Sequence, residues 1–151
     1  MSGARVSETA TPSSADGGAA SELGASLARA ERTVTRRLSR ILEQDGVGIE
    51  AWRVLCLLAD GEGHPMAQVA EAALVPAPSL TRLADRLVAD NLVYRRADDR
   101  DRRRVLVYAT ERGLALQRRL AARVELAADG VLAAATPRDV ARIIALLDRL
   151  E

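Results

Sequence analysis

Two short amphipathic patterns lie almost back to back in the middle of the chain. Residues 67–73 and 77–89 each repeat apolar side chains at helical spacing, and only the three residues Leu74, Val75 and Pro76 separate them. A tight turn between two short helices allows the second helix to be presented outward, and a helix of this width enters the major groove of DNA. The pattern predicts a helix-turn-helix within a mainly helical fold.

The second of these helices has an apolar face and a polar one. Pro78 falls in its first turn, where a missing N–H costs little, and Leu80, Leu83, Ala84 and Leu87 share the apolar side. Short hydroxyl and arginine side chains on the other side suit base edges and phosphates, although the same pattern also occurs on solvated helix faces. The candidate DNA-binding residues here are Ala77, Pro78, Ser79, Thr81, Arg82 and Arg86.

A hairpin follows, with strands predicted at residues 92–96 and 105–108. Residues 95–104 between and beside them contain six arginines and three aspartates. An arginine-tipped loop suits the negative potential of a narrow minor groove, and flanking arginines can neutralise phosphates. The aspartates would hold some arginines in fixed rotamers; the alternative is a loop of internally paired charges. The candidate DNA-binding residues of this wing are Arg96, Arg100, Arg102, Arg103 and Arg104.

Long helical patterns flank this central block. One runs from Leu23 to Leu42 and stops at Asp45–Gly46, a second follows Thr110, and a third begins at Thr136–Pro137. The last carries an apolar stripe of Val140, Ile143, Ile144, Leu147 and Leu150.

These helices have more apolar surface than the small central lobe can cover, which predicts a homodimer. A two-fold dimer implies an inverted-repeat operator with half-sites about one helical turn apart. The predicted organisation is a flexible tail over residues 1–20 and one domain over 21–151. That domain comprises dimerisation helices at 22–44 and 111–151 and a winged helix-turn-helix lobe at 48–110.

Composition excludes several classes of function. All 22 basic residues are arginine, against 21 acidic ones, and aromatic residues make up 2%, which disfavours a base-stacking platform for single strands. No apolar run is long enough to span a bilayer, no signal peptide is evident, and a lone cysteine suits a reducing compartment. We therefore expect a soluble, cytoplasmic protein that is not bound to a membrane.

The chain has no pattern typical of an enzyme or a cofactor site. There is no nucleophile with a base, no paired carboxylates in a predicted pocket and no phosphate-binding glycine loop. One cysteine and one histidine do not suffice for a zinc site built from nitrogen and sulfur. We expect no catalytic residues, no metal and no cofactor.

The sequence resembles the MarR family of winged helix-turn-helix transcriptional regulators. The resemblance rests on Leu80–Leu87 in the recognition helix, on Asp98–Arg103 in the wing and on Thr110–Gly113 after it. It implies a mainly α fold with a small β-hairpin wing, whose N-terminal and C-terminal helices form the dimer. Leu74 and Asn91 depart from the family pattern, standing where a glycine is common.

The resemblance also implies a function. It implies a homodimeric, ligand-responsive repressor that binds double-stranded DNA in the cytoplasm and responds to a phenolic or aromatic small molecule. Ser79, Thr81 and Arg82 would face the major groove, and Arg100 or Arg102 would enter the minor groove. Arg86 and Arg103 would contact phosphates or form internal ion pairs. The alternative function is a helical dimeric protein-interaction module without specific DNA binding.

Three further residues have two interpretations each. Trp52 is a core anchor or lines an effector pocket. Cys56, in an apolar helical run that we expect to carry Trp52, Leu55, Cys56 and Ala59 inward, is a core residue or a thiol switch. His64, next to Pro65, is expected in a short strand or turn behind the wing, where a ligand role is the alternative.

Overall fold

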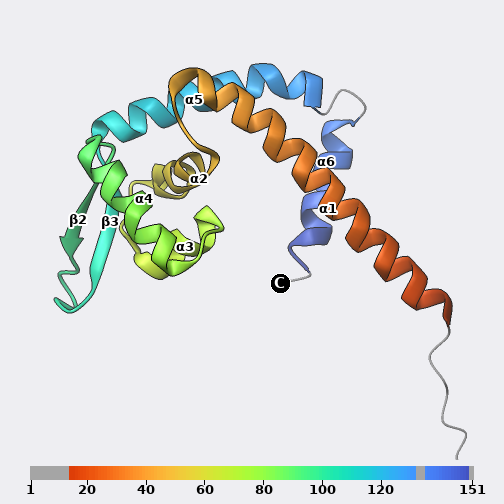
Figure 1. Cartoon of the computed structure of the whole chain (residues 1–151), viewed down its shortest axis with the longest axis horizontal. Helices are drawn as coiled ribbons and strands as arrows, with labels where there is room; N and C mark the ends of the chain where they lie inside the picture. Colours follow the sequence, from red (N-terminus) through yellow and green to blue (C-terminus); the bar gives the residue numbers. More distant parts are fainter. Residues whose placement is uncertain (1–13, 132–134, 150–151) are drawn as a thin grey trace, which may run out of the picture. The chain divides into compact units, whose positions relative to one another are not determined.

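The computed structural model describes residues 14–131 and 135–149, which form a mainly helical chain with one small sheet (Figure 1). None of the described helices combines the length and apolarity that crossing a membrane requires. The chain divides into two compact units, residues 1–34 and 35–151. The helices are α1 (Ser14–Leu42), α2 (Ile49–Leu57), α3 (Met66–Ala73), α4 (Ala77–Ala89), α5 (Glu111–Val131) and α6 (Pro137–Leu147), and the strands are β1 (His64–Pro65), β2 (Val93–Ala97) and β3 (Val105–Ala109).

The first unit contains the N-terminal part of α1. This helix begins at Ser14, earlier than the predicted start at Leu23, because the segment before Leu23 lacks the apolar period on which the prediction rests. Of the tail predicted over residues 1–20, the first thirteen lie outside the described residues and the rest are helical. From residue 18 to 34 only Ser26 and Leu27 are half-buried.

The second unit contains the end of α1 and a small core behind it. A single 3-10 turn, Glu43–Asp45, follows α1, and Gly46 leaves it in the left-handed region with a φ of 69°. Val47 and Trp52 then pack together with Leu42 and Leu120 across the start of α2. This cluster fixes the end of α1 and the start of α2 against α5.

The larger core lies between α2, α3, α4 and the sheet. Its members are apolar side chains from each of these elements, all almost inaccessible to solvent. They are Val54, Leu55, Leu58, Val69, Ala73, Leu80, Leu87, Leu92, Val93 and Val107. The predicted apolar face of α4 is confirmed, since Leu80, Ala84 and Leu87 are buried.

The three strands form an antiparallel sheet in the order β1-β3-β2. His64 pairs with Val107, which confirms the predicted short strand behind the wing. Tyr94 lies opposite Tyr108 on the hairpin, and their rings stack with centroids 5.2 Å apart. In Figure 1 the hairpin of β2 and β3 projects away from α2, α3 and α4.

Cys56 and Ala59 correct the prediction for α2. Both are exposed, whereas Val54, Leu55 and Leu58 turn into the core. The side chains from Val54 to Leu58 are apolar on every side of the helix, but neighbouring elements cover only some of those sides. Cys56 is therefore not a core residue.

Two residues other than glycine adopt left-handed backbone conformations. Asn91 does so after α4 with a φ of 55°, and Leu74 does so in the helix-turn-helix turn with a φ of 56°. A left-handed leucine is strained because its Cβ approaches the following carbonyl. Leu74 is 68% exposed, so its side chain recovers little of that cost by burial.

Leu74→Gly is therefore expected to raise the free energy of unfolding by about 0.5–1 kcal/mol, since glycine adopts this φ without strain. Urea unfolding of the two proteins at equal concentration measures the difference. Leu74→Ala removes most of the same side chain but keeps the strain, so it should give no gain. Equal stability of the glycine and alanine variants would contradict the assignment of strain to Leu74.

His64 links the turn before β1 to α3. Its Nε2 lies 2.9 Å from Asp60 Oδ2 and its Nδ1 lies 2.9 Å from Gln68 Oε1. Partial burial lowers the pKa of His64, but the hydrogen bonds with Gln68 and Asp60 outweigh it, so the pKa is raised above its ordinary value. Protonated His64 thus connects the turn before β1 to α3 through its hydrogen bonds with Asp60 and Gln68.

The stability that His64 adds should be fully present below its unfolded pKa of 6.5 and should be lost as pH rises through the raised pKa. The free energy of unfolding of the wild type should then fall more steeply between about pH 6 and pH 8.5 than that of His64→Gln. Urea unfolding across this range measures both slopes. Parallel pH profiles for the two proteins would show that His64 does not contribute in this way.

Helix α6 begins as predicted. Thr136 is its N-cap and forms a capping box with Asp139, with Pro137 in the first turn. Its apolar residues Ile143, Ile144, Leu146 and Leu147 are exposed, and Leu150 of the predicted stripe lies outside the described residues.

Candidate nucleic-acid interface

Helix α4 presents the polar face that the sequence predicts. Pro76 precedes its first turn, and its carbonyl accepts hydrogen bonds from the N–H groups of Ser79 and Leu80. All six predicted recognition residues are exposed: Ala77, Pro78, Ser79, Thr81, Arg82 and Arg86. Neither Arg82 nor Arg86 forms an ion pair within the described part of the chain, so both guanidinium groups are available to a ligand.

The turn before α4 sets how this face is presented. The N–H of Leu74 bonds to the carbonyls of Ala70 and Glu71, and the N–H of Val75 bonds to Ala70. These bonds satisfy the last carbonyls of α3 in the manner of a Schellman motif, although the residue in the left-handed position is a leucine. The buried face of α4 packs on α2 and α3, and the opposite face remains free.

The wing loop is closed by its own aspartates. Asp98 donates its backbone N–H to the carbonyl of Arg104 and accepts the N–H of Arg100 on its side chain. Asp101 accepts the N–H of Arg103 on its side chain, and its carbonyl accepts the N–H of Arg104. These hydrogen bonds close the loop within residues 98–104.

Three of the six wing arginines are paired. Arg95 bonds to Asp85 of α4 at 2.8 Å, Arg96 pairs with Asp99, and Arg103 lies 3.3 Å from Asp101. The sequence predicted that aspartates within the loop would hold arginines, but nothing in the local pattern indicated the partner of Arg95, which lies on another element.

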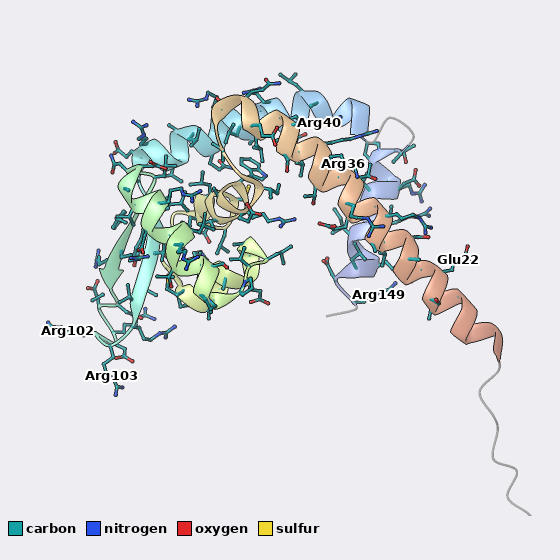
Figure 2. The ribbon with its side chains drawn as sticks, viewed as in Figure 1. Glu22, Arg36, Arg40, Arg102, Arg103 and Arg149 are labelled. Carbon is teal, nitrogen blue, oxygen red and sulfur yellow. The ribbon has the colours of Figure 1, made fainter. Side chains whose placement is uncertain are left out.

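The other three wing arginines have no carboxylate partner among the described residues. They are Arg100, Arg102 and Arg104, all exposed. Figure 2 shows Arg102 and Arg103 at the far end of the hairpin, pointing away from the helices. The alternative of a fully internally paired loop is therefore wrong, since half of the positive charges remain free.

Trp52 is packed against apolar side chains. Its ring is buried with Leu42, Val47 and Leu120, which is the core-anchor interpretation. A hollow of about 470 Å³ is lined by Val47 and by other residues of the α1–α2 turn, the end of α4 and α5. The sequence gives no signal for this hollow, because the residues that line it lie far apart in the chain.

The thiol of Cys56 is poorly suited to redox chemistry. Desolvation raises its pKa, and a hydrogen bond with the side chain of Gln117 on α5 only partly offsets this effect. A raised pKa keeps the group as an unreactive thiol near neutral pH. The exposed position corrects the core assignment but does not supply an activated cysteine.

Comparison with known proteins identifies this arrangement. Residues 45–104, which contain the helix-turn-helix and most of the hairpin, match the model of the MarR family. The HTH-type transcriptional regulator MhqR of Bacillus subtilis is 29% identical over 90 residues, which are 60% of this chain and 62% of that protein. The aligned region thus covers less than two thirds of this curated relative.

Solved structures with the same fold extend the likeness beyond that segment. A mutant MarR from E. coli complexed with operator DNA is 25% identical, with a TM-score of 0.73 over 85% of this chain and 93% of that one. The transcriptional regulator PA4135 is 26% identical, with a TM-score of 0.77 over 85% of this chain and 94% of that one. The fold is thus that of the MarR winged-helix regulators.

Proposed function

We propose that the chain is a member of the MarR family, whose model matches residues 45–104, and that it is a homodimeric, sequence-specific DNA-binding regulator. Helix α4 enters the major groove with Ser79, Thr81 and Arg82, and Arg86 contacts the phosphate backbone. Arg100 or Arg102 of the wing enters the neighbouring minor groove. The protein acts as a repressor in the cytoplasm, where its DNA lies. We assign it no catalytic activity.

One observation carries this proposal: the arginines of the wing without a carboxylate partner and the exposed polar face of α4 belong to one lobe with a shared buried core. The ion pair between Arg95 and Asp85 joins strand β2 to α4, and both elements share one buried core. Helix α4 and the wing are therefore joined within one lobe before DNA binds. A preordered pair of contacts reduces the entropy cost of binding.

The apolar residues left exposed on α5 and α6 support the homodimer. Ile143, Ile144 and Leu146 lie close together on α6, and Leu126 on α5 is 82% exposed. A second copy of the chain would cover such side chains. Two-fold symmetry then places two copies of the reading lobe on two half-sites of an inverted repeat.

Selection from a pool of random duplexes tests the proposed function. Purified protein should enrich an inverted repeat whose half-sites lie about one helical turn apart. Failure to enrich any sequence, with the protein folded and dimeric, would overturn the proposal and favour the helical protein-interaction module instead.

A further inference from the structure

The polar face of α4 borders a hollow of about 270 Å³. Its apolar lining is Val75 of the helix-turn-helix turn and Leu83 of α4, both half-buried. Its polar lining is Ser79, Arg82 and Arg86 of α4 and Glu50 of α2. The hollow therefore joins residues that we assign to DNA binding with one acidic side chain from another helix.

Glu50 has a defined place on α2. Gly48 is the N-cap of this helix, and Glu50 lies in its first turn. A Cβ built on Gly48 would lie 3.3 Å from Glu50 Oε2, so the carboxylate lies close to the N-terminus of α2. A negative charge is stabilised there by the helix dipole. Trp52 and Val54 of the same helix are buried, so α2 keeps Glu50 at this wall of the hollow.

The three charged side chains of the hollow are not paired with one another. Among residues 14–131 and 135–149, the charged groups of Glu50, Arg82 and Arg86 form no ion pair and no hydrogen bond. Glu50 is half-buried, whereas both arginines are exposed. A guanidinium carries five N–H donors, so an arginine can bind DNA while its other donors still face the carboxylate.

A carboxylate in this position distinguishes the two partners that an arginine finds on DNA. A phosphate is anionic, so its approach to Arg82 brings it towards the like charge of Glu50. The edge of a guanine is uncharged, and its O6 and N7 acceptors bind a guanidinium without that repulsion. Glu50 therefore favours contact of Arg82 with a base edge over contact with a phosphate.

We propose that Glu50 is a specificity-determining residue, which acts through Arg82 and needs no contact with DNA. The proposal rests on the proposed function, in which Arg82 faces the major groove. On sequences other than the operator, phosphate contacts supply essentially all of the affinity. Glu50 thus weakens binding to those sequences more than binding to the operator, and it widens the difference between the two affinities.

Glu50→Gln tests this role, because it keeps the size of the side chain and removes the charge. At one salt concentration it should tighten binding to a duplex with both half-sites scrambled at least about fivefold. Binding to the selected operator should tighten no more than about twofold, so the ratio of the two affinities should fall at least about twofold.

The salt dependence gives a second measurement on the same variant. In Glu50→Gln each Arg82 gains a phosphate contact on the scrambled duplex. The slope of log affinity against log salt on that duplex should therefore become steeper by up to about two for a dimer. A purely structural role of Glu50 would not produce this change.

Three further variants serve as controls. Glu125→Gln removes the same charge from an exposed position of α5 outside the hollow, and it should leave the ratio of affinities unchanged. Glu50→Asp keeps the charge and should keep most of the ratio. In an Arg82→Gln background, Glu50→Gln should change both affinities by the same factor, because the side chain through which it acts is absent.

Several results would overturn the proposal. Equal tightening on the two duplexes would show that Glu50 acts only through overall charge, and weaker binding to both would show a structural role. Weaker binding to the operator alone would show that the carboxylate contacts DNA, for example by accepting the N4 amino group of cytosine.

Failure of the proposed function is distinguishable from failure of this role. The lack of any selected operator would overturn the proposed function. The titration of the scrambled duplex needs no operator, and an unchanged affinity and salt slope there would overturn the role of Glu50 whether or not an operator is found.

Discussion

Replacing Arg100 and Arg102 together by alanine is expected to weaken operator binding at least about 100-fold. Both side chains are exposed and lack a carboxylate partner among the described residues, so no internal ion pair competes with DNA for them. A dimer loses four arginines in this variant. The slope of log affinity against log salt should therefore become shallower by up to about four, which a titration of labelled operator over a salt series measures.

The control is Arg118→Ala with Arg142→Ala, which lowers the net charge by the same amount at exposed positions of α5 and α6. It should retain most of the affinity and the salt slope of the wild type. Equal losses in the two double variants would show that only overall charge matters. Unchanged affinity in the Arg100 and Arg102 variant would show that the wing does not contact DNA.

Gly113→Ala is expected to destabilise the fold by about 3 kcal/mol. Gly113 lies in the first turn of α5, where a Cβ would stand 2.1 Å from the carbonyl oxygen of Leu92. The contact is with backbone that two further bonds hold in place: the Thr110 N–H donates to Leu92, and the Thr110 hydroxyl donates to Asn91 at 2.7 Å. Urea unfolding at fixed protein concentration measures the loss.

Gly24→Ala is the matched control for this substitution. Gly24 lies within α1, and nothing comes within 4 Å of a Cβ at that position. Alanine favours a helix over glycine, so this variant should be as stable as the wild type or more stable by up to about 1 kcal/mol. The same direction of change in both variants would contradict the steric account of Gly113.

The elements of the fold could largely be predicted because local signals determine them. The apolar period of residues 77–89 and the proline after Thr136 each act within a few residues. The hairpin followed from two β-branched segments on either side of a polar loop. The start of α1 could not be predicted in this way, since residues 14–22 are helical without an apolar period.

Features that depend on contacts between distant residues could not be predicted from the sequence. Asp45 lies 74 and 78 residues from Arg119 and Arg123, and only the folded chain brings them together. The burial of Trp52 and the exposure of Cys56 depend on which side of α2 is covered, which a run of apolar residues does not reveal. Arg100, Arg102 and Arg104 lack a carboxylate partner because the aspartates pair with other arginines, and the local pattern does not show which arginines these are.

Binding to an intact inverted repeat, compared with a duplex in which one half-site is scrambled, tests the account most directly. Two protomers should bind the intact duplex, with affinity falling by about 10³-fold or more between about 50 and 200 mM salt. Scrambling one half-site should remove most of that affinity. Equal binding to the two duplexes with little dependence on salt would contradict a dimer that reads DNA with α4 and the wing.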